Sequence, residues 1–359
     1  MTPDDRLPDA YSRVATDDDR APRTEEALEE RLSRPTPAVV EALAAAAGDV
    51  IVLGAGGKMG PSLVAMLARA VQQLGDGRRI TAVSRWSDAD AAARLERLGA
   101  RLVRGDLLDT PFLASLPDAP NIVYLAGQKF GTRDAPHRTW MTNTVLAARA
   151  AERYRTSRIV AFSTGNVYPL VPADGAGSRE GDPLSPVGEY AMSCVGRERV
   201  FEDAAERWGT RIALLRLNYA VDLRYGVLVD LAQRIMAGAP IDLAMGYVNC
   251  IWQGDANALA LRAFPLASAP PFVVNLTGPA RLSVRQVAAA LGERLGRPPV
   301  FHGTEAPDAL LSDTTRLRER LGAPAVDEAT LVAWVADWVG GGGRTLGKAT
   351  RFERRDGGF

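Results

Sequence analysis

The chain has 359 residues, of which 47% are hydrophobic and 24% are charged, an ordinary composition for a globular protein. Its 43 basic and 43 acidic residues give a formal net charge of +0, so nothing indicates a basic surface for nucleic acid. Cys194 and Cys250 are the only cysteines, and His137 and His302 are the only histidines, so we expect neither a disulfide framework nor a metal site. No apolar run has the length of a membrane span, and the acidic N-terminus lacks a signal-peptide pattern, so we expect a cytoplasmic protein.

Residues 1–48 are predicted to form an N-terminal extension that is partly helical. The part up to about Arg23 is polar and contains several prolines, which is typical of a mobile or loosely docked arm. A helical pattern begins at Thr24, and Ala38–Ala47 is expected to be a short helix that Gly48 ends. The function of this extension is not evident from its residues.

A glycine-rich turn between a strand and a helix organises the first half of the chain. The apolar run Val50–Leu53 has the length of a buried strand, and apolar residues at helical spacing follow the turn. In a nucleotide-binding unit Gly54 would make the tight turn, Gly57 would let the backbone approach a diphosphate, and Gly60 would let helix and strand pack closely. Free N–H groups at the helix start would then face the phosphates. An ordinary glycine-rich turn of an α/β protein is the alternative interpretation.

Strand and helix patterns alternate over residues 49–225. Such alternation predicts an α/β fold, a Rossmann-type doubly wound parallel sheet with helices on both faces. The pattern changes over residues 226–339, which we expect to form a smaller C-terminal α/β substrate lobe interleaved with the end of the sheet. Residues 340–359 begin with four consecutive glycines, so their composition predicts a flexible tail. The predicted strands are 50–53, 79–84, 101–104, 121–126, 158–163, 211–217 and 272–276.

Beyond the glycine turn, further short motifs follow one another along the chain. They are, in order, Gly105-Asp106-Leu107, Leu125-Ala126-Gly127, Asn143, the segment 162–168, Tyr190 and Gln253-Gly254-Asp255. The ordered series resembles the extended short-chain dehydrogenase/reductase family, which contains the NAD-dependent epimerases and dehydratases of nucleotide sugars. The resemblance covers about Asp49–Val339 and implies a nicotinamide dinucleotide cofactor.

The resemblance also implies a catalytic pair, Thr164 and Tyr190. In the family a Tyr acts as general acid/base on a substrate hydroxyl while hydride moves to or from the nicotinamide, and a Ser or Thr on the preceding strand binds the reacting oxygen. Free Tyr titrates near pH 10, so the family supplies a Lys four residues later whose charge favours tyrosinate. This chain has Cys194 at that position, and a neutral thiol cannot perform that function. We interpret Cys194 as a small buried residue and not as a nucleophile.

Lys129 is the candidate for the missing charge. It lies in a glycine-flanked loop after the fourth predicted strand, and in this fold such a loop leaves the sheet beside the nicotinamide ribose. A cation within about 4–6 Å of Tyr190 would lower the pKa of the phenol. We therefore predict that Lys129 is both a catalytic and a cofactor-binding residue, with a solvated loop lysine as the alternative.

The end of the second predicted strand bears on the choice of cofactor. An acidic residue there would bind the ribose 2′-hydroxyl and repel a 2′-phosphate. The chain has Ser84 and Arg85 instead, and an Arg can pair with a phosphate through two hydrogen bonds. We therefore expect a preference for NADP(H), with NAD(H) as the weaker ligand, and a solvated Arg is the alternative. The predicted cofactor-binding residues are Gly54, Gly56, Gly57, Lys58, Met59, Gly60, Ser84, Arg85, Asp106, Leu107, Leu125, Ala126, Gly127, Lys129, Asn143 and Tyr190.

Two hypotheses for function follow from these residues. The first is an oxidoreductase, epimerase or dehydratase that acts on a sugar or polyol-type substrate, and the second is a non-catalytic NAD(P)-binding sensor or scaffold, which the missing Lys favours. The chain is apolar near Val248, where nucleotide-sugar enzymes often place a diphosphate-binding Arg, and this argues against a nucleotide-diphosphate sugar. A homodimer is a possible oligomeric state, and we expect no nucleic-acid or membrane partner. The predicted substrate-binding residues are Thr164, Asn166, Asn218, Tyr219 and Arg224, for which packing or a solvated loop is the alternative.

Overall fold

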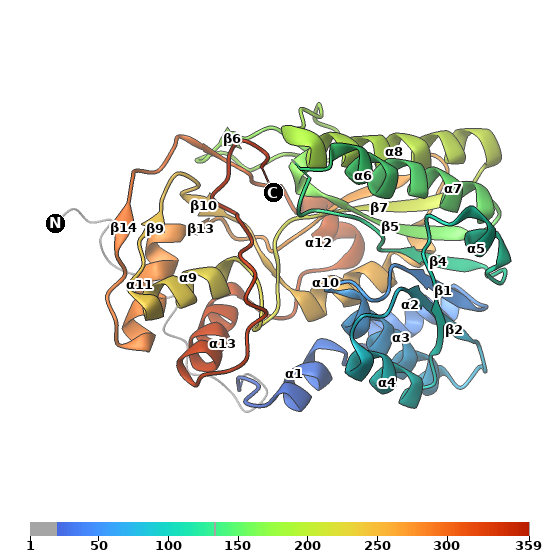
Figure 1. Cartoon of the computed structure of the whole chain (residues 1–359), viewed down its shortest axis with the longest axis horizontal. Coiled ribbons are helices and arrows are strands. Elements are labelled where there is room, and N and C mark those ends of the chain that lie inside the picture. Colours follow the sequence, from blue (N-terminus) through green and yellow to red (C-terminus); the bar gives the residue numbers. More distant parts are fainter. Residues whose placement is uncertain (1–19, 133, 359) are drawn as a thin grey trace.

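Seven parallel strands form the central sheet of the protein, whose computed structural model describes residues 20–132 and 134–358. The strand order is β12-β7-β5-β4-β1-β2-β3, and every neighbouring pair is parallel (Figure 1). The order reverses beside β1, where Val50 lies opposite Ile80 of β2 on one side and Asn121 of β4 on the other. This confirms the predicted doubly wound parallel sheet. The strands are β1 (Val50–Leu53), β2 (Ile80–Ser84), β3 (Arg101–Arg104), β4 (Asn121–Tyr124), β5 (Arg158–Thr164), β7 (Arg211–Leu217) and β12 (Phe272–Leu276).

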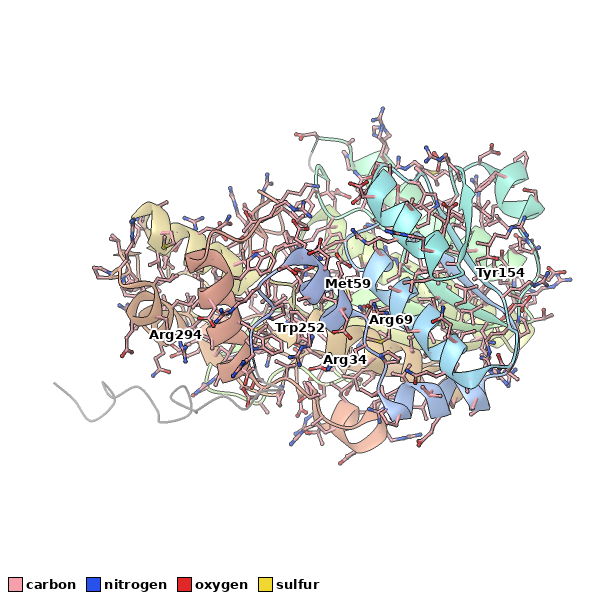
Figure 2. All side chains as sticks on the ribbon, turned by 90° about the horizontal axis from the view of Figure 1, so that it is seen from below. Arg34, Met59, Arg69, Tyr154, Trp252 and Arg294 are labelled. Carbon is pink, nitrogen blue, oxygen red and sulfur yellow. The ribbon has the colours of Figure 1, made fainter. Side chains whose placement is uncertain are left out.

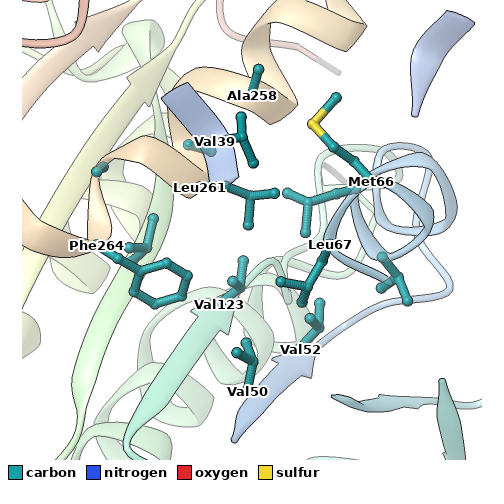
Figure 3. Close-up of a cluster of buried hydrophobic side chains, with 14 of the residues drawn as sticks. Val39, Val50, Val52, Met66, Leu67, Val123, Ala258, Leu261 and Phe264 are labelled. Atoms are coloured by element: carbon teal, nitrogen blue, oxygen red, sulfur yellow. The ribbon is translucent and has the colours of Figure 1, made fainter. Parts of the chain in front are cut away.

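Helices cover both faces of the sheet, each over its own hydrophobic core. On one face Leu261 of α10 belongs to the same buried cluster as Val52 and Val123 of the strands (Figure 3). On the other face the ring of Phe201 in α8 meets the ring of Tyr124 edge-on, with centroids 5.4 Å apart. The first layer contains α2 (Pro37–Ala45), α3 (Gly60–Leu74), α4 (Ala89–Arg97) and α10 (Gln253–Arg262), and the second contains α5 (Thr110–Ser115), α7 (Leu146–Arg153) and α8 (Gly188–Trp208).

The C-terminal part of the chain builds a second core beside the sheet domain. Its helices α9, α11 and α13 pack on one another, and the rings of Trp252 and Trp334 meet edge-on with centroids 5.3 Å apart. Tyr154 of the sheet domain and Arg294 of this lobe lie toward opposite ends of the molecule, with Met59 of the glycine turn between them (Figure 2). The lobe elements are α9 (Val227–Ala237), α11 (Val284–Leu295), α13 (Glu328–Gly340), and the paired short strands β9 (Ile241–Asp242) with β14 (Phe301–His302) and β10 (Tyr247–Val248) with β13 (Leu282–Ser283).

The remaining elements join the two parts. Strand β12 lies between the lobe strands β10 and β13 in the chain, yet it pairs with β7 at the edge of the main sheet, and α12 packs against it. The sheet domain and the lobe are therefore interleaved in sequence. The joining elements are β6 (Val171–Pro172) with β15 (Asp308–Ala309), β8 (Ala220–Val221) with β11 (Ile251–Trp252), and α12 (Thr315–Leu321).

Two helices precede the first strand, and each packs into a different core. Helix α1 (Glu25–Leu32) begins after Thr24, whose Oγ1 accepts a hydrogen bond from the first helical turn at 3.2 Å. Leu28 and Leu32 of α1 are buried in the core of the lobe, whereas α2 packs into the core of the sheet domain. Most of the arm expected over residues 1–23 lies outside the described residues.

The C-terminal tail is docked on the protein, contrary to the flexibility that its glycines predict. It runs along the front of the molecule from α13 toward β6 (red in Figure 1). Thr350 donates to Oδ2 of Asp230 from its N–H at 2.7 Å and from its hydroxyl at 2.5 Å, and Phe352 is only 2% exposed. The composition-based prediction is wrong because a buried carboxylate 120 residues away supplies the partner that orders the tail.

The helical segment after β4 contains a π-helical turn. It consists of α6 (Pro136–Trp140), the π-helical turn η4 (Met141–Val145) and α7, in direct succession. Single π-helical turns are often found at functional sites, and this one carries Asn143.

No helix within residues 20–132 and 134–358 is both long and apolar enough to cross a membrane. In the same part of the chain, no group of three His, Cys, Asp or Glu side chains could hold a metal ion.

We predict that Gly60→Ala destabilises the fold by about 3 kcal/mol, because the close approach of α3 to β1 leaves no room for a side chain. A Cβ at Gly60 would lie 2.1 Å from the carbonyl oxygen of Ala55. Gly57→Ala is the matched control, since the nearest atom to a Cβ there is the carbonyl oxygen of Gly54 at 3.4 Å. Urea unfolding should show a lower midpoint for Gly60→Ala at an unchanged slope, and equal midpoints for the two variants would contradict the prediction.

Candidate functional site

A cavity of about 300 Å³ lies where the strand order reverses. Its walls are the glycine turn after β1, the loop after β4, the end of β5, the segment 217–227 that leads into the lobe, and Thr350 of the tail. Open α/β sheets bind ligands at such a switch point, at the carboxyl ends of the strands. The cavity brings together the predicted residues Gly54, Gly57, Lys58, Met59, Gly60, Leu125, Gly127, Lys129, Thr164, Asn166, Tyr190, Asn218 and Tyr219.

The glycine turn has the shape and the donors that a diphosphate needs. Gly54 has a φ of +88°, and a Cβ there would lie 2.6 Å from the backbone N of Ala126. Gly57 leaves the backbone open to a ligand. Helix α3 begins at Gly60 without a side chain that caps its first N–H groups. The N–H of Gly60 donates to the carbonyl of Gly57 at 3.1 Å, and Pro61 has no N–H. The backbone N–H groups of Lys58, Met59 and Ser62 and the positive end of the helix dipole therefore face an anion, and the turn fits the diphosphate of a dinucleotide.

Thr164 and Tyr190 lie together on the cavity wall. Thr164 ends β5 and Tyr190 lies in the first turn of α8, and their hydroxyls are hydrogen-bonded. Asn166 donates from Nδ2 to Oγ1 of Thr164 at 3.0 Å. Burial is the main cause that raises the pKa of Tyr190 well above its usual range, and the neighbouring thiol of Cys194 adds to the shift. The phenol is therefore protonated at neutral pH.

A buried ion pair fixes α8 against the sheet. Arg216 of β7 donates from Nη2 to Oε2 of Glu198 at 2.7 Å, and both side chains are buried. The hydroxyl of Ser163 donates to Oε1 of the same carboxylate at 2.5 Å. These bonds set the position of α8 relative to β5 and β7, and they thereby place Tyr190 beside Thr164.

Cys194 lies one turn after Tyr190 and is fully buried among Val167 and Tyr168. Burial raises the pKa of its thiol, and the charge of the nearby Arg197 only partly opposes this effect. A buried neutral thiol packs as a small apolar residue and is a poor nucleophile.

Arg197 is a cation of the cavity that the sequence analysis missed. It follows Tyr190 by two helical turns on the same face of α8, and this spacing is the signal that could have identified it. Its Nη1 donates to the carbonyl of Phe162 at 2.9 Å, and its Nη2 donates to Oδ1 of Asn143 at 2.8 Å. Its charge opposes the burial that raises the pKa of Tyr190. A Cβ at Gly127 would come within 2.7 Å of Nη2, so the glycine is what admits this guanidinium.

Two lysines reach the cavity from different loops. The Nζ of Lys58 donates to the carbonyl of Ala220 at 3.0 Å and lies 3.9 Å from the ring centroid of Tyr225. Burial lowers the pKa of Lys58 to about 7, and Asp222 opposes this shift. Because the residue as a whole is exposed toward the cavity, solvent there will moderate the shift. Burial likewise lowers the pKa of Lys129 to about 8.

Asn143 positions the loop after β4. Its Oδ1 accepts the backbone N–H of Gln128 at 2.8 Å, and its Nδ2 donates to the hydroxyl of Ser193 at 2.9 Å. Because Oδ1 also accepts from Arg197, the side chain amide links this loop to α8.

The residues predicted for the adenosine end of a cofactor lie outside the cavity, on the far side of the glycine turn. Ser84 ends β2, and a Cβ at Gly56 would lie 2.4 Å from its hydroxyl oxygen. Arg85 is exposed, and Trp86 beside it is buried with a φ of +50°. Asp106 is exposed and Leu107 is buried. A tryptophan with positive φ is unusual and reflects the close packing of this corner.

Arg224 lies outside the cavity wall, unlike the other predicted substrate-binding residues. Its guanidinium donates to Asp222 at 2.7 Å and to Glu29 of α1 at 2.6 Å, so it ties the N-terminal extension to the lobe. Asn218 donates from Nδ2 to the carbonyl of Leu310 at 3.3 Å. This bond fixes its side chain amide at the edge of the cavity.

The chain can now be compared with known proteins. Residues 50–222 match the model of the NAD dependent epimerase/dehydratase family, and comparison with curated proteins gives no match. Pal from Bacillus thuringiensis superposes with a TM-score of 0.67 at 17% identity, over 81% of this chain and 98% of that chain. UDP-glucose 4-epimerase from Thermotoga maritima gives 0.66 at 19% identity, over 81% and 98%. The UDP-Glc/GlcNAc 4-epimerase from Campylobacter jejuni gives 0.66 at 22% identity, over 81% and 99%. These structures share the fold of the chain, and the similarity to the NAD dependent epimerase/dehydratase family model lies in residues 50–222.

Proposed function

We propose that the protein is an NAD(P)-dependent oxidoreductase, epimerase or dehydratase that acts on a sugar or polyol-type small molecule. The observation that carries this proposal is the hydrogen-bonded pair Thr164 and Tyr190. The pair lies in the same cavity wall as the glycine turn before α3. The family match over residues 50–222 supports the same chemistry. A protein of the same fold, at 20% identity, is the UDP-glucose 4-epimerase from Brucella ovis in complex with NAD.

The residues of the cavity fit a nicotinamide dinucleotide. The glycine turn, with the backbone N–H groups of residues 58, 59 and 62, would hold the diphosphate, and the segment Leu125–Gly127 would lie against the nicotinamide half. When bound, the cofactor supplies the site that gives or accepts hydride. The chain supplies the proton chemistry and the orientation of the substrate.

Tyr190 is the proposed general acid. Its raised pKa keeps a proton on the phenol, which can be donated to the oxygen of a carbonyl substrate that gains hydride. Thr164 would orient that oxygen through its hydroxyl, and Asn166 holds Thr164 in place. Oxidation of an alcohol requires the reverse transfer, so a cation must lower the pKa of Tyr190. Lys129 and Arg197 are the candidates, since both line the cavity.

A non-catalytic NAD(P)-binding sensor is the second candidate function, and the neutral thiol of Cys194 one turn after Tyr190 favours it. Incubation with NADPH and a panel of sugars and keto sugars, followed by mass analysis of products, separates the two functions. An enzyme gives a product that Tyr190→Phe abolishes while cofactor binding is retained. A sensor binds the cofactor and gives no product with any member of the panel.

We predict tighter binding of NADP(H) than of NAD(H), because Ser84 and Arg85 replace an acidic residue at the end of β2. Arg85→Ala should lower the preference about tenfold, the loss expected of one charge-assisted pair. Arg101→Ala is the matched control, because Arg101 begins β3 beside Thr81, near the start of β2 and away from Arg85. Fluorescence titration with both cofactors measures the ratio. Equal affinities in the unmodified protein, or an unchanged ratio in Arg85→Ala, would show the prediction to be wrong.

We predict that Lys129→Met lowers turnover by at least about 100-fold, because the reaction loses the cation that assists proton transfer at Tyr190. Cys194→Ala should have a far smaller effect, since it removes only the hydrogen bond between a neutral thiol and Tyr190 and no charge. A lysine introduced by Cys194→Lys should partly rescue Lys129→Met if the two positions serve one site. The pH dependence of kcat is the decisive readout: the apparent pKa of the acid/base group should rise in Lys129→Met. An unchanged profile would refute the role of Lys129.

A further inference from the structure

The charged side chains that line the cavity are all positive. They are Lys58, Lys129 and Arg197, and no Asp or Glu of the described residues belongs to the lining. This contrasts with the chain as a whole, whose formal net charge is +0. A cavity with one sign of charge raises the local concentration of ligands of the opposite sign.

Lysine is rare in this protein, which makes its position informative. The 43 basic residues comprise 40 arginines and three lysines. Two of the three, Lys58 and Lys129, line the cavity, and the third, Lys348, is exposed in the tail. Arginine forms the ion pairs of the described residues, whereas two of the three lysines, compact charges with rotatable donors, line the cavity.

The two lysines come from different segments of the cavity wall, the glycine turn and the loop after β4. Lys58 starts on the glycine turn but extends away from it, to the carbonyl of Ala220 and the ring of Tyr225 on the lobe side. Lys129 lies in the loop after β4, which also carries Phe130. They are close enough that the charge of Lys129 adds to the burial that lowers the pKa of Lys58.

The acidic groups around these lysines have other partners. Asp222 accepts hydrogen bonds from the backbone N–H of Arg224 at 2.9 Å and from its guanidinium at 3.1 Å and 2.7 Å, and is held by that ion pair. Asp230, which faces both lysines, accepts two hydrogen bonds from Thr350. Other titratable groups near the lysines are Arg224 and the phenol of Tyr225, beside Lys58, and the neutral thiol of Cys194, beside Lys129. The positive charge of the cavity is thus only partly balanced by the protein.

We propose that Lys58 and Lys129 together form a subsite for an acidic group of the substrate, either a carboxylate or a phosphate. The proposal rests on the proposed function, because it names the class of substrate that the Thr164 and Tyr190 pair would act on: an acidic hydroxy or keto compound. An anion between the two ammonium groups would accept charge-assisted hydrogen bonds from both and would relieve their mutual repulsion.

The diphosphate of the cofactor does not account for this subsite. The backbone of the glycine turn and the positive end of the α3 dipole would serve that group, whereas the ammonium of Lys58 is on the lobe side, at Ala220 and Tyr225. A second anion site on the lobe side is therefore expected to remain available when the cofactor is bound.

The test is calorimetric titration of the full chain at pH 8, with and without saturating NADP⁺, using three matched probes: glucose, glucuronate and glucose 6-phosphate. We expect at least one acid to bind about tenfold or more tightly than glucose in both conditions. Lys58→Met and Lys129→Met should each remove most of that preference, and Lys348→Met should leave it unchanged. Comparison of glucuronate with glucose 6-phosphate shows whether the subsite takes a carboxylate or a phosphate.

Proton linkage provides a second readout that does not depend on turnover. Burial lowers the pKa of Lys58 to about 7 and that of Lys129 to about 8, so at pH 8 both amines are partly neutral. An anion favours the charged amines and raises both pKa values, so binding should take up protons, seen as a dependence of the heat on the buffer. This uptake should fall in each cavity variant and persist in Lys348→Met.

Three results would overturn the proposal. They are equal binding of glucose and both acids, an acid preference that survives in Lys58→Met and Lys129→Met, and competition of the acids with NADP⁺, which would assign the lysines to the cofactor. A failure of the proposed function is recognised separately. If neither NADP⁺ nor NAD⁺ binds while the acid preference is present and depends on both lysines, the subsite stands and the dinucleotide-dependent function falls.

Discussion

The buried ion pair between Glu198 and Arg216 determines where the chemistry of this protein can take place. A charged pair in a protein interior is tolerated only when its remaining hydrogen bonds are also made. The hydroxyl of Ser163 donates a hydrogen bond to the carboxylate of Glu198, and the hydroxyl of Tyr168 accepts one from the guanidinium of Arg216 at 2.7 Å. These hydrogen bonds all form when α8 lies as it does against β5 and β7, so they fix the position of the helix. Since α8 carries Tyr190, they also fix the position of Tyr190 in the cavity.

The positive charge of the site is distributed differently from the pattern that the family resemblance implies. The position one turn after Tyr190 holds a thiol, and the charge of the helix appears at Arg197, one turn farther on. The other charges, Lys58 and Lys129, come from loops. A guanidinium fixed by two carbonyl oxygens and Asn143 cannot move toward a ligand, whereas loop lysines can. Arg197 on the helix thus supplies a positive charge at a fixed position, whereas the ammonium groups of Lys58 and Lys129 on the loops can move toward a ligand.

Local patterns in the sequence were sufficient to predict the sheet and the glycine turn. A strand such as β1 is a short apolar run bounded by a turn, and the tight geometry at Gly54 and Gly60 requires glycine, so both features are visible in neighbouring residues. Features that depend on distant partners were not predictable. The docking of the tail depends on Asp230, and the role of Arg197 in the cavity depends on Asn143, whose π-helical turn has no recognised sequence signal. Arg224 appeared to be a ligand-binding residue because Glu29, its partner, lies 195 residues away.

The docked tail has a consequence for the order in which the site is completed during synthesis. Thr350 forms part of the cavity wall, and it is made after every strand of the main sheet and after all the other residues of that wall. Chains emerge from the ribosome N-terminal end first, at about 5–20 residues per second, and domains begin to fold as they emerge. A nascent chain can therefore form the sheet and the glycine turn while the cavity still lacks this wall. The enclosed form of the site belongs only to a chain that has been translated through Thr350 and whose tail has found Asp230.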